Sequence, residues 1–285
     1  MAETSGMAEL RGIQIDTLAK GFADEEMILR KFLTNTPTSA REVRWYKKTT
    51  GFLTVSPPQS VLSAPGAMPT VVEQSLTRQT SYVNEYFVSS PILTDEDIKD
   101  SDPDILAINI RDLVRKIEKT IDTAIYDAIT DATGIETTAA IGTGWDDTTN
   151  GNPIKDLLTA KRKIRVNGYN PEGAILYINP IEHENLINYL ITVKGSSIPS
   201  FSSALMGPGV VMEILGLRVV VSENATTDEA LVFVPQRAAT WKSFMELTTR
   251  AIDEPLIGTT IRVKEAGITL VTDVGAVHVT TDTVT

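Results

Sequence analysis

Residues 102–131, DPDILAINIRDLVRKIEKTIDTAIYDAITD, carry the strongest structural signal in the chain. The Asp-Pro pair at their start is typical of a helix N-cap and first turn. Apolar residues then recur at spacings of three and four, as on the buried face of an amphipathic helix. The pattern predicts one helix about 43 Å long, with the charged residues between the apolar positions, Glu118 and Asp122 among them, on its solvated face. Few small domains need so long a helix.

The fifty residues before this helix carry strand patterns. Residues 43–55 are rich in aromatic and β-favouring side chains, and residues 71–88 alternate between apolar and polar. The segment between them contains four prolines, which exclude a helix. We therefore expect a long two-stranded ribbon. Because an isolated ribbon is marginally stable in water, we expect this one to lie on another chain.

Nearer the N-terminus, residues 13–33 have mixed helical spacing and predict a short helix. Residues 34–40, TNTPTSA, form a cluster of breaker residues. We expect this cluster to be a loop that releases the chain from the packing before it.

The second half of the chain predicts a small α+β domain. Residues 133–152 are rich in Gly and Thr and predict turns. The pairs Asn152-Pro153 and Asn179-Pro180 each predict a helix start, and the apolar run 174–178 between those two helices predicts a buried strand. Further strands are expected at 217–221, 231–234, 239–244, 259–264, 268–272 and 276–280, the last three separated by Gly267 and Gly275.

Composition excludes several classes of protein. The chain has 285 residues, of which 42% are apolar, with 26 Lys and Arg against 37 Asp and Glu, a net charge of −11. The apolar content suffices for a folded core, and the acidity argues against direct gripping of DNA. The absence of Cys excludes disulfides and thiolate sites. An acidic N-terminus and the absence of a long apolar run predict a soluble protein that is neither exported by a signal peptide nor inserted in a membrane.

Candidate catalytic and metal-binding residues are few. The chain has only two histidines: we expect His183 to be a solvated helix residue and His278 to be a partly exposed strand residue. Residues 146–152 resemble the opening of a calcium loop, but Leu157 occupies the twelfth position, where a bidentate Glu is needed, so we interpret them as a Gly/Asn turn.

The acidic residues before the long helix are interpreted as a solvated helix N-terminus, and phosphate-binding and nucleophile-elbow motifs are absent. These residues are Asp95, Glu96, Asp97, Asp100, Asp102 and Asp104. We therefore predict no catalytic residue, no cofactor site and no metal site. A structural role is the expectation that remains.

The order of the elements, with short motifs along it, resembles the major capsid protein of tailed bacteriophages, the Hong Kong 97 type fold. The resemblance covers nearly the whole chain. Its motifs are residues 67–72 (AMPTVV) followed by Glu73, 90–100 (SPILTDEDIKD), 104–131, 174–190 (AILYINPIEHENLINYL), 214–222 (ILGLRVVVS), 231–234 and 239–244.

The resemblance implies an α+β subunit with an N-terminal arm, an extended β-hairpin loop, a peripheral domain built on a long spine helix, and an axial α+β domain. The implied boundaries are 1–40 for the arm, 41–82 for the loop, 83–152 for the peripheral domain with the spine helix, 153–245 for the axial domain, and 246–285 for the returning strands of the peripheral domain and the C-terminus.

The implied function is that of a shell protein, which is not an enzyme and which assembles as hexamers and pentamers into an icosahedral capsid around double-stranded DNA. Arm and loop carry more apolar surface than one subunit can cover, and neighbouring subunits are expected to bury it. These apolar residues are Trp45, Tyr46, Phe52, Leu53, Val61 and Leu62. The acidity is expected to keep packaged DNA from adhering to the inner wall. Portal, scaffold and decoration proteins are the implied partners, and the implied location is the virion, assembled in the bacterial cytoplasm.

Two departures from the family pattern are visible. No long charged helical segment precedes the arm, so a fused scaffold is not expected; either a separate scaffold protein exists or assembly needs none. Some relatives join subunits through a Lys-Asn isopeptide bond assisted by a Glu; Lys47 and Lys48 lie in the ribbon, but no Asn or Glu of this chain matches that motif.

Alternatives remain open. An encapsulin-type nanocompartment would have the same fold and would hold a cargo enzyme in place of a genome. An acidic two-domain hydrolase would be a compact monomer or dimer. A β-rich attachment protein is disfavoured by the long helix.

Overall fold

The computed structural model describes residues 15–23, 28–48, 65–68, 76–94, 96, 105–147, 149–194, 213–254 and 257–284. The described residues fall into two compact units. Unit 1 comprises those within Met1–Val43, Thr80–Ile125 and Trp241–Thr269. Unit 2 comprises those within Arg44–Gln79, Tyr126–Thr240 and Leu270–Thr285.

Some expected features lie outside the described residues. They are the Asp102-Pro103 helix cap, the acidic residues before it apart from Glu96, the ribbon residues 49–64 and 69–75, and with these Phe52, Leu53, Val61 and Leu62.

The long helix, α3 (Ile105–Thr130), confirms the first prediction. Its apolar residues form one buried row, because a spacing of three and four returns the side chain to the same face. The fully buried members of this row are Ile110, Val114, Ile117, Ile121, Ile125 and Ile129.

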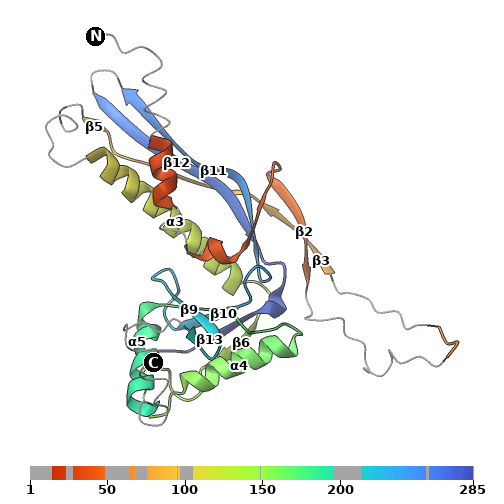
Figure 1. The fold of residues 1–285 in the computed structure, drawn as a ribbon. Coiled ribbons are helices and arrows are strands. Elements are labelled where there is room, and N and C mark those ends of the chain that lie inside the picture. Colours follow the sequence, from red (N-terminus) through yellow and green to blue (C-terminus); the bar gives the residue numbers. More distant parts are fainter. Residues whose placement is uncertain are drawn as a thin grey trace. The chain divides into compact units, whose positions relative to one another are not determined.

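Unit 1 is built on a five-stranded sheet in the order β1-β11-β12-β4, with β5 also pairing to β12. Figure 1 shows β11 and β12 side by side as its two long strands. Strand β12 pairs antiparallel with β4, Val263 opposite Val88, and with β5, Thr259 opposite Leu93. The strands are β1 (Thr34–Pro37), β4 (Asn84–Ser89), β5 (Leu93–Thr94), β11 (Thr240–Glu254) and β12 (Gly258–Leu270).

The N-terminal part of unit 1 contains the short helix predicted within residues 13–33 and departs from the prediction in the segment that follows. Residues 15–23 are helical and bury Ile15, Ala19 and Ala23, and a short 3₁₀ turn, η1 (Leu29–Phe32), follows. The predicted loop at 34–40 is wrong in its first half, because residues 34–37 form β1 beside β11. A strand ending in proline is compatible with this place, since β1 lies at the edge of the sheet.

Strand β12 replaces the two strands predicted at 259–264 and 268–272. Gly267 does not interrupt this strand. The glycine is needed because Trp241 packs against it: a Cβ built at position 267 would lie 2.2 Å from Cζ2 of Trp241. The indole therefore fills the space that a side chain at position 267 would occupy.

Unit 2 holds a six-stranded sheet in the order β6-β13-β10-β7-β9-β8. Pairing is antiparallel between β10 and β13, β10 and β7, and β8 and β9, and parallel between β7 and β9 and between β13 and β6. The strands are β6 (Glu136–Ala139), β7 (Ile175–Ile178), β8 (Glu213–Ile214), β9 (Leu217–Val221), β10 (Glu229–Phe233) and β13 (Val277–Thr281).

Both predicted helix starts in unit 2 are confirmed. Asn152 accepts a hydrogen bond from the backbone N–H of Lys155 at the start of α4 (Pro153–Val166), and Asn179 accepts one from Ile181 at the start of α5 (Pro180–Tyr189). A π-helical turn, η3 (Leu190–Lys194), continues α5. Strand β7 is buried throughout, as its apolar run predicts. A core cluster joins α4, α5 and the sheet; Leu157, Ile164, Leu176, Leu186, Leu217 and Val232 are among its members.

One segment of unit 2 and one segment shared by the two units differ from expectation. The Gly/Thr-rich region 133–152 contains strand β6, which pairs with β13, some 140 residues later in the chain. The segment 246–285 contributes to both sheets, β12 to the five-stranded one and β13, after a short 3₁₀ turn η4 (Val274–Ala276), to the six-stranded one.

Strands β2 (Glu42–Lys48) and β3 (Leu76–Tyr82) form a separate two-stranded sheet, which confirms the predicted strand pairing for the described part of the ribbon. The alternation predicted over 71–88 holds in β4, where Tyr86 and Val88 are half-buried and Glu85 and Phe87 are exposed. In β3 every residue except Ser81 is exposed.

Candidate functional site: a buried charge cluster and an exposed apolar surface

A buried ionic cluster in unit 1 surrounds the guanidinium of Arg30. Its Nη2 donates to Oε2 of Glu118 on α3 at 2.5 Å, and its Nη1 donates to Oε1 of Glu265 on β12. Arg30 also lies over the ring of Trp241 on β11, 5.6 Å from the ring centroid. All four side chains are buried. One arginine thus joins the segment after the first helix to α3 and to the sheet.

Asp122 binds the backbone of the segment that contains Arg30. Its Oδ2 accepts hydrogen bonds from the N–H groups of Ile28 and Leu29 at 3.0 and 3.4 Å. Asp122 lies one helical turn after Glu118, so both carboxylates project from one face of α3. Leu29 itself is fully buried.

Burial dominates the protonation of these carboxyls, because it disfavours their charged forms. Burial raises the pKa of Glu118 to about 7, against the attraction of Arg30. Burial raises the pKa of Asp122 to about 6, against its hydrogen bonds from Ile28 and Leu29. The pKa of Glu265 is raised by burial as well.

The solvated position predicted for Glu118 and Asp122 is wrong: both are fully buried. A signal for this burial does exist in the sequence. Val114, Glu118, Asp122 and Tyr126 follow one another at intervals of four residues, so the two carboxylates lie in a row that starts and ends with a buried apolar residue. Without knowledge of Arg30 as a partner, a charged residue in such a row is read as exposed.

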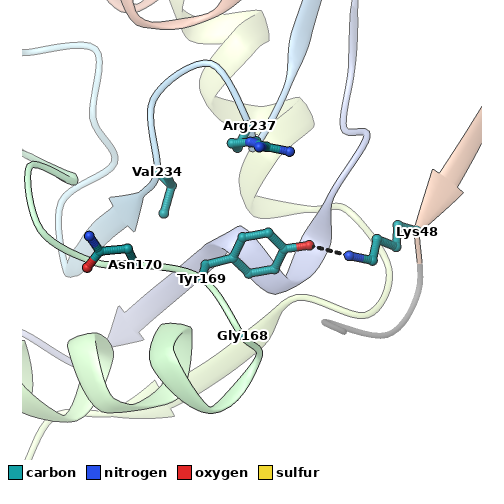
Figure 2. A pocket seen from close by; sticks show the side chains of 6 residues that line it. All are labelled: Lys48, Gly168, Tyr169, Asn170, Val234 and Arg237. Carbon is teal, nitrogen blue, oxygen red and sulfur yellow. Dashed lines mark hydrogen bonds between the residues drawn. The ribbon is translucent and has the colours of Figure 1, made fainter. Parts of the chain in front are cut away.

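A second polar cluster, in unit 2, surrounds Tyr169 and lines a pocket of about 330 Å³. Figure 2 shows the Tyr169 hydroxyl pointing toward Lys48, whose Nζ donates to it at 2.7 Å. The hydroxyl in turn donates to Oδ2 of Asp273. Burial and the carboxylate of Asp273 raise the pKa of Tyr169, so this hydroxyl remains protonated.

The preceding residue, Lys47, is also used within the chain. Its Nζ donates to the backbone carbonyl of Thr133, and burial lowers its pKa. Both lysines at the end of β2 are therefore anchored in unit 2.

Both histidines lie on the predicted elements, His183 on α5 and His278 on β13, but both are less exposed than the sequence predicts. His278 is 1% exposed, because β13 runs between β6 and β10 and is packed by α4; its Nε2 lies 3.1 Å from Oγ1 of Thr138. Burial lowers its pKa to about 4. His183 is half-buried, its Nε2 is shielded from solvent without a hydrogen-bond partner among the described residues, and burial lowers its pKa.

The Gly/Asn turn predicted at 146–152 is confirmed in the part that is described. Asp147 organises it by accepting hydrogen bonds from the backbone N–H of Thr149 at 2.8 Å and from the side-chain amide of Asn150 at 3.0 Å. Within the described residues, acidic and histidine side chains nowhere form a group of three or more that could hold a metal ion. Among the described helices, none is long and apolar enough to cross a bilayer.

Large apolar side chains are exposed on the strands of the ribbon and on β4. The exposed fractions are 61% for Tyr46, 50% for Leu76, 68% for Tyr82 and 58% for Phe87. In the part of the chain that is described, β4 also ends the five-stranded sheet, which leaves one of its edges open. An open edge with apolar side chains favours pairing with another chain.

Several solved structures that resemble this chain are capsids. The capsid protein of cyanophage P-SCSP1u is 14% identical, with 90% of this chain and 88% of that chain covered and a TM-score of 0.68. The subunit of a virus-like particle from Pyrococcus furiosus is 12% identical, with 95% of this chain and 99% of that chain covered and a TM-score of 0.67. A Mycobacterium phage Che8 protein is 18% identical, with 86% of each chain covered and a TM-score of 0.61. The fold is the Hong Kong 97-like capsid fold.

A comparison with curated proteins gives no match in sequence. The sequence profile of the family described as phage capsid protein matches residues 92–279, about two thirds of the chain. The match includes α3, strands β5, β11 and β12 of the five-stranded sheet, and the six-stranded sheet apart from the last two residues of β13. This chain therefore belongs to the phage capsid protein family and is a structural shell protein.

Proposed function

We propose that this chain assembles with copies of itself, as hexamers and pentamers, into a closed icosahedral shell around double-stranded DNA. The observation that carries the proposal is the exposed apolar surface on β2, β3 and β4; among the described large apolar side chains of unit 1, Tyr82 and Phe87 are the most exposed. Copies of one chain that cover such surfaces for one another form large obligate interfaces, on the order of 2,000 Å². Interfaces of that size hold subunits together despite their like charge.

The domain roles follow from the same proposal. The unit with α3 and the five-stranded sheet would be the peripheral domain, and the unit with the six-stranded sheet would be the axial domain at the centre of each capsomer. Strands β2 and β3 would be the base of the extended loop that reaches a neighbouring subunit. Residues 1–40 would form the arm, in keeping with the contacts of Arg30.

The charge of the chain supports enclosure of DNA without sequence-specific binding. A net charge of −11 would repel packaged DNA if the inner wall carries its share of the carboxylates. A basic inner wall in the assembled shell would contradict this part of the proposal. Portal, scaffold and decoration proteins complete the proposed set of partners, with assembly in the host cytoplasm and no catalytic activity.

The nanocompartment alternative is less supported, because the family that matches the chain is one of phage capsid proteins. A hydrolase is disfavoured for the same reason.

Analysis of purified particles tests the DNA part of the proposal. Particles isolated from infected cells and treated with nuclease should retain double-stranded DNA and should copurify with portal and tail proteins. Particles that instead retain an enzyme and no genome would identify a nanocompartment.

A further inference from the structure

The segment 28–33, called the arm segment here, is held to unit 1 by three buried carboxyls. Asp122 accepts the backbone N–H groups of Ile28 and Leu29, while Glu118 and Glu265 bind the guanidinium of Arg30. If all three carboxyls are ionised, one positive charge faces three negative charges in a site shielded from water. Such an excess of buried like charge is unfavourable, and a buried site relieves it by binding protons.

Other charged or titratable groups face this site without balancing it. Glu246 on β11 raises the negative charge near Glu265, and Tyr86 is paired opposite Glu265 in β4. Lys20, from the first helix, lines the same cavity but forms its ion pair with Asp16. Counting Lys20, Arg30 and the carboxylates of Glu118, Asp122, Glu246 and Glu265, the site remains negative.

The two glutamates offer a place for one proton. Oε1 of Glu118 and Oε2 of Glu265 are buried and receive no donor among the described residues when both carboxyls are ionised. A proton bound by Glu118 makes that carboxyl a hydrogen-bond donor, and a hydrogen bond from Glu118 lowers the pKa of Glu265 against the larger effect of burial, so Glu118 is the better holder of the proton. One bound proton therefore replaces the repulsion between the two carboxylates with a hydrogen bond between them.

Solvent can exchange this proton. A cavity of about 340 Å³ opens on the pair and is lined by Arg30, Glu118 and Glu265 together with residues from the first helix and β11. A metal ion is a poorer occupant than a proton, because Arg30 lies between the two carboxylates and the described residues offer no group of three ligands.

We propose that the Glu118–Glu265 pair holds one proton while the arm segment is docked, and that docking of the segment to α3 and β12 weakens as pH rises toward neutrality and this proton is lost to water. The arm segment is then a proton-linked latch. Its strength changes with pH without a change in the fold of either sheet.

The direction follows from the shift in the pKa of Glu118 to about 7, above its ordinary value of 4.5. Stabilisation by a group whose pKa is raised in the docked state is present at low pH and is lost as pH rises through the docked value. With these two values, the equilibrium constant for docking falls about thirtyfold between pH 5.5 and pH 8.5. Asp122 adds a step of the same sign near pH 6.

Hydrogen exchange of the full-length chain tests the latch. The readout is the protection factor of the amides of residues 28–33, corrected for the intrinsic base-catalysed rate, at pH values from 5.5 to 8.5. We expect protection to fall by about tenfold or more over this range, mostly between pH 5.5 and pH 7 and levelling off above pH 7, while the amides of β7 in unit 2 stay protected.

Isosteric variants separate the latch from general charge effects. Glu118→Gln is neutral at every pH and can donate to Glu265 as the protonated acid does, so its protection should fall by only about fivefold between pH 5.5 and pH 8.5, which is the part that Asp122 contributes. Glu265→Gln should show the same reduced pH dependence, and it replaces Glu118→Gln in the test if that variant does not fold. Asp122→Asn should retain a fall of tenfold or more between pH 5.5 and pH 8.5, as should the matched control Glu246→Gln at the exposed rim of the cavity. Protection of the wild-type segment that is independent of pH, or a full step in both Glu118→Gln and Glu265→Gln, would overturn the proposal.

Discussion

The indole Nε1 of Trp145 donates a hydrogen bond of 2.9 Å to Oδ2 of Asp156, and both side chains are buried. The other oxygen of Asp156 accepts the backbone N–H of Ile141 at 3.1 Å. One carboxylate in the first turn of α4 thereby holds the segment before that helix in place.

The Asp156→Asn variant should lower the free energy of unfolding by about 1–3 kcal/mol, because an amide has one acceptor oxygen for two donors and turns its own NH₂ toward one of them. Urea denaturation followed by circular dichroism measures the change. The control is Glu184→Gln, an exposed carboxyl on α5, which should stay within about 0.5 kcal/mol of wild type. Equal stability of Asp156→Asn and the control would contradict the role given to Asp156.

Gly267→Ala should destabilise unit 1 by about 1–3 kcal/mol, because the new Cβ would lie 2.2 Å from Cζ2 of Trp241 unless the ring moves. Gly21→Ala is the matched control: nothing lies within 4 Å of its added Cβ, and alanine is the better helix residue. In thermal unfolding, Gly267→Ala should have a lower Tm than wild type, and Gly21→Ala should have an equal or higher Tm. If Gly267→Ala is as stable as wild type, the indole of Trp241 can move to admit a side chain at position 267, and the packing role given to Gly267 is wrong.

The stability contributed by His278 should fall in acid. Burial lowers its pKa to about 4, whereas the unfolded chain binds a proton near pH 6.5, so the native state resists protonation. The free energy of unfolding therefore decreases as pH falls from about 6.5 toward 4. The decrease between pH 7 and pH 5 is about 2 kcal/mol. This sign is opposite to that of the latch at Glu118.

His278→Gln should remove that part of the pH dependence. Chemical unfolding of both proteins at pH 7 and pH 5 gives the comparison, with the difference between the two proteins as the readout. If the variant loses as much stability as wild type on acidification, the buried neutral histidine is not the source.

Phe87→Ser should leave the subunit folded and impair assembly, because the side chain is 58% exposed in the single chain and its removal costs little until a neighbour would cover it. Circular dichroism checks the fold, and sedimentation velocity measures the fraction in large particles. Phe87→Leu keeps the apolar contact and is the control. Normal particle yield from Phe87→Ser would exclude Phe87 from an interface.

Purified particles should give a single band near 31 kDa on denaturing electrophoresis. Lys47 and Lys48, the lysines at the end of β2, donate to Thr133 and to Tyr169 of their own chain, so neither is placed for an isopeptide bond to a neighbour. A ladder of multimers that persists in denaturant would refute this prediction, and loss of the ladder in Lys48→Met would then identify the lysine involved.

Local signals sufficed for much of the fold. The helix α3, the Asn-Pro starts of α4 and α5 and the buried strand β7 each follow from residues adjacent in sequence, and the structure confirms them. The order of these elements also sufficed for the capsid resemblance, which the family match bears out.

Features that depend on distant partners were predicted wrongly. Strand β6 is polar and short, and only its pairing with β13 makes it a strand. The burial of Glu118 depends on Arg30, which lies 88 residues earlier. His278 is buried because strands remote in sequence enclose it on either side. Periodicity within a segment carries no information about such partners.

The central claim is that one copy of this chain is incomplete until siblings cover its exposed strands. Sedimentation velocity of the purified full-length chain, with negative-stain microscopy of the fastest fraction, tests it most directly. We predict closed particles of megadalton mass built from a single polypeptide. A stable, monodisperse species near 31 kDa at all concentrations would contradict the claim.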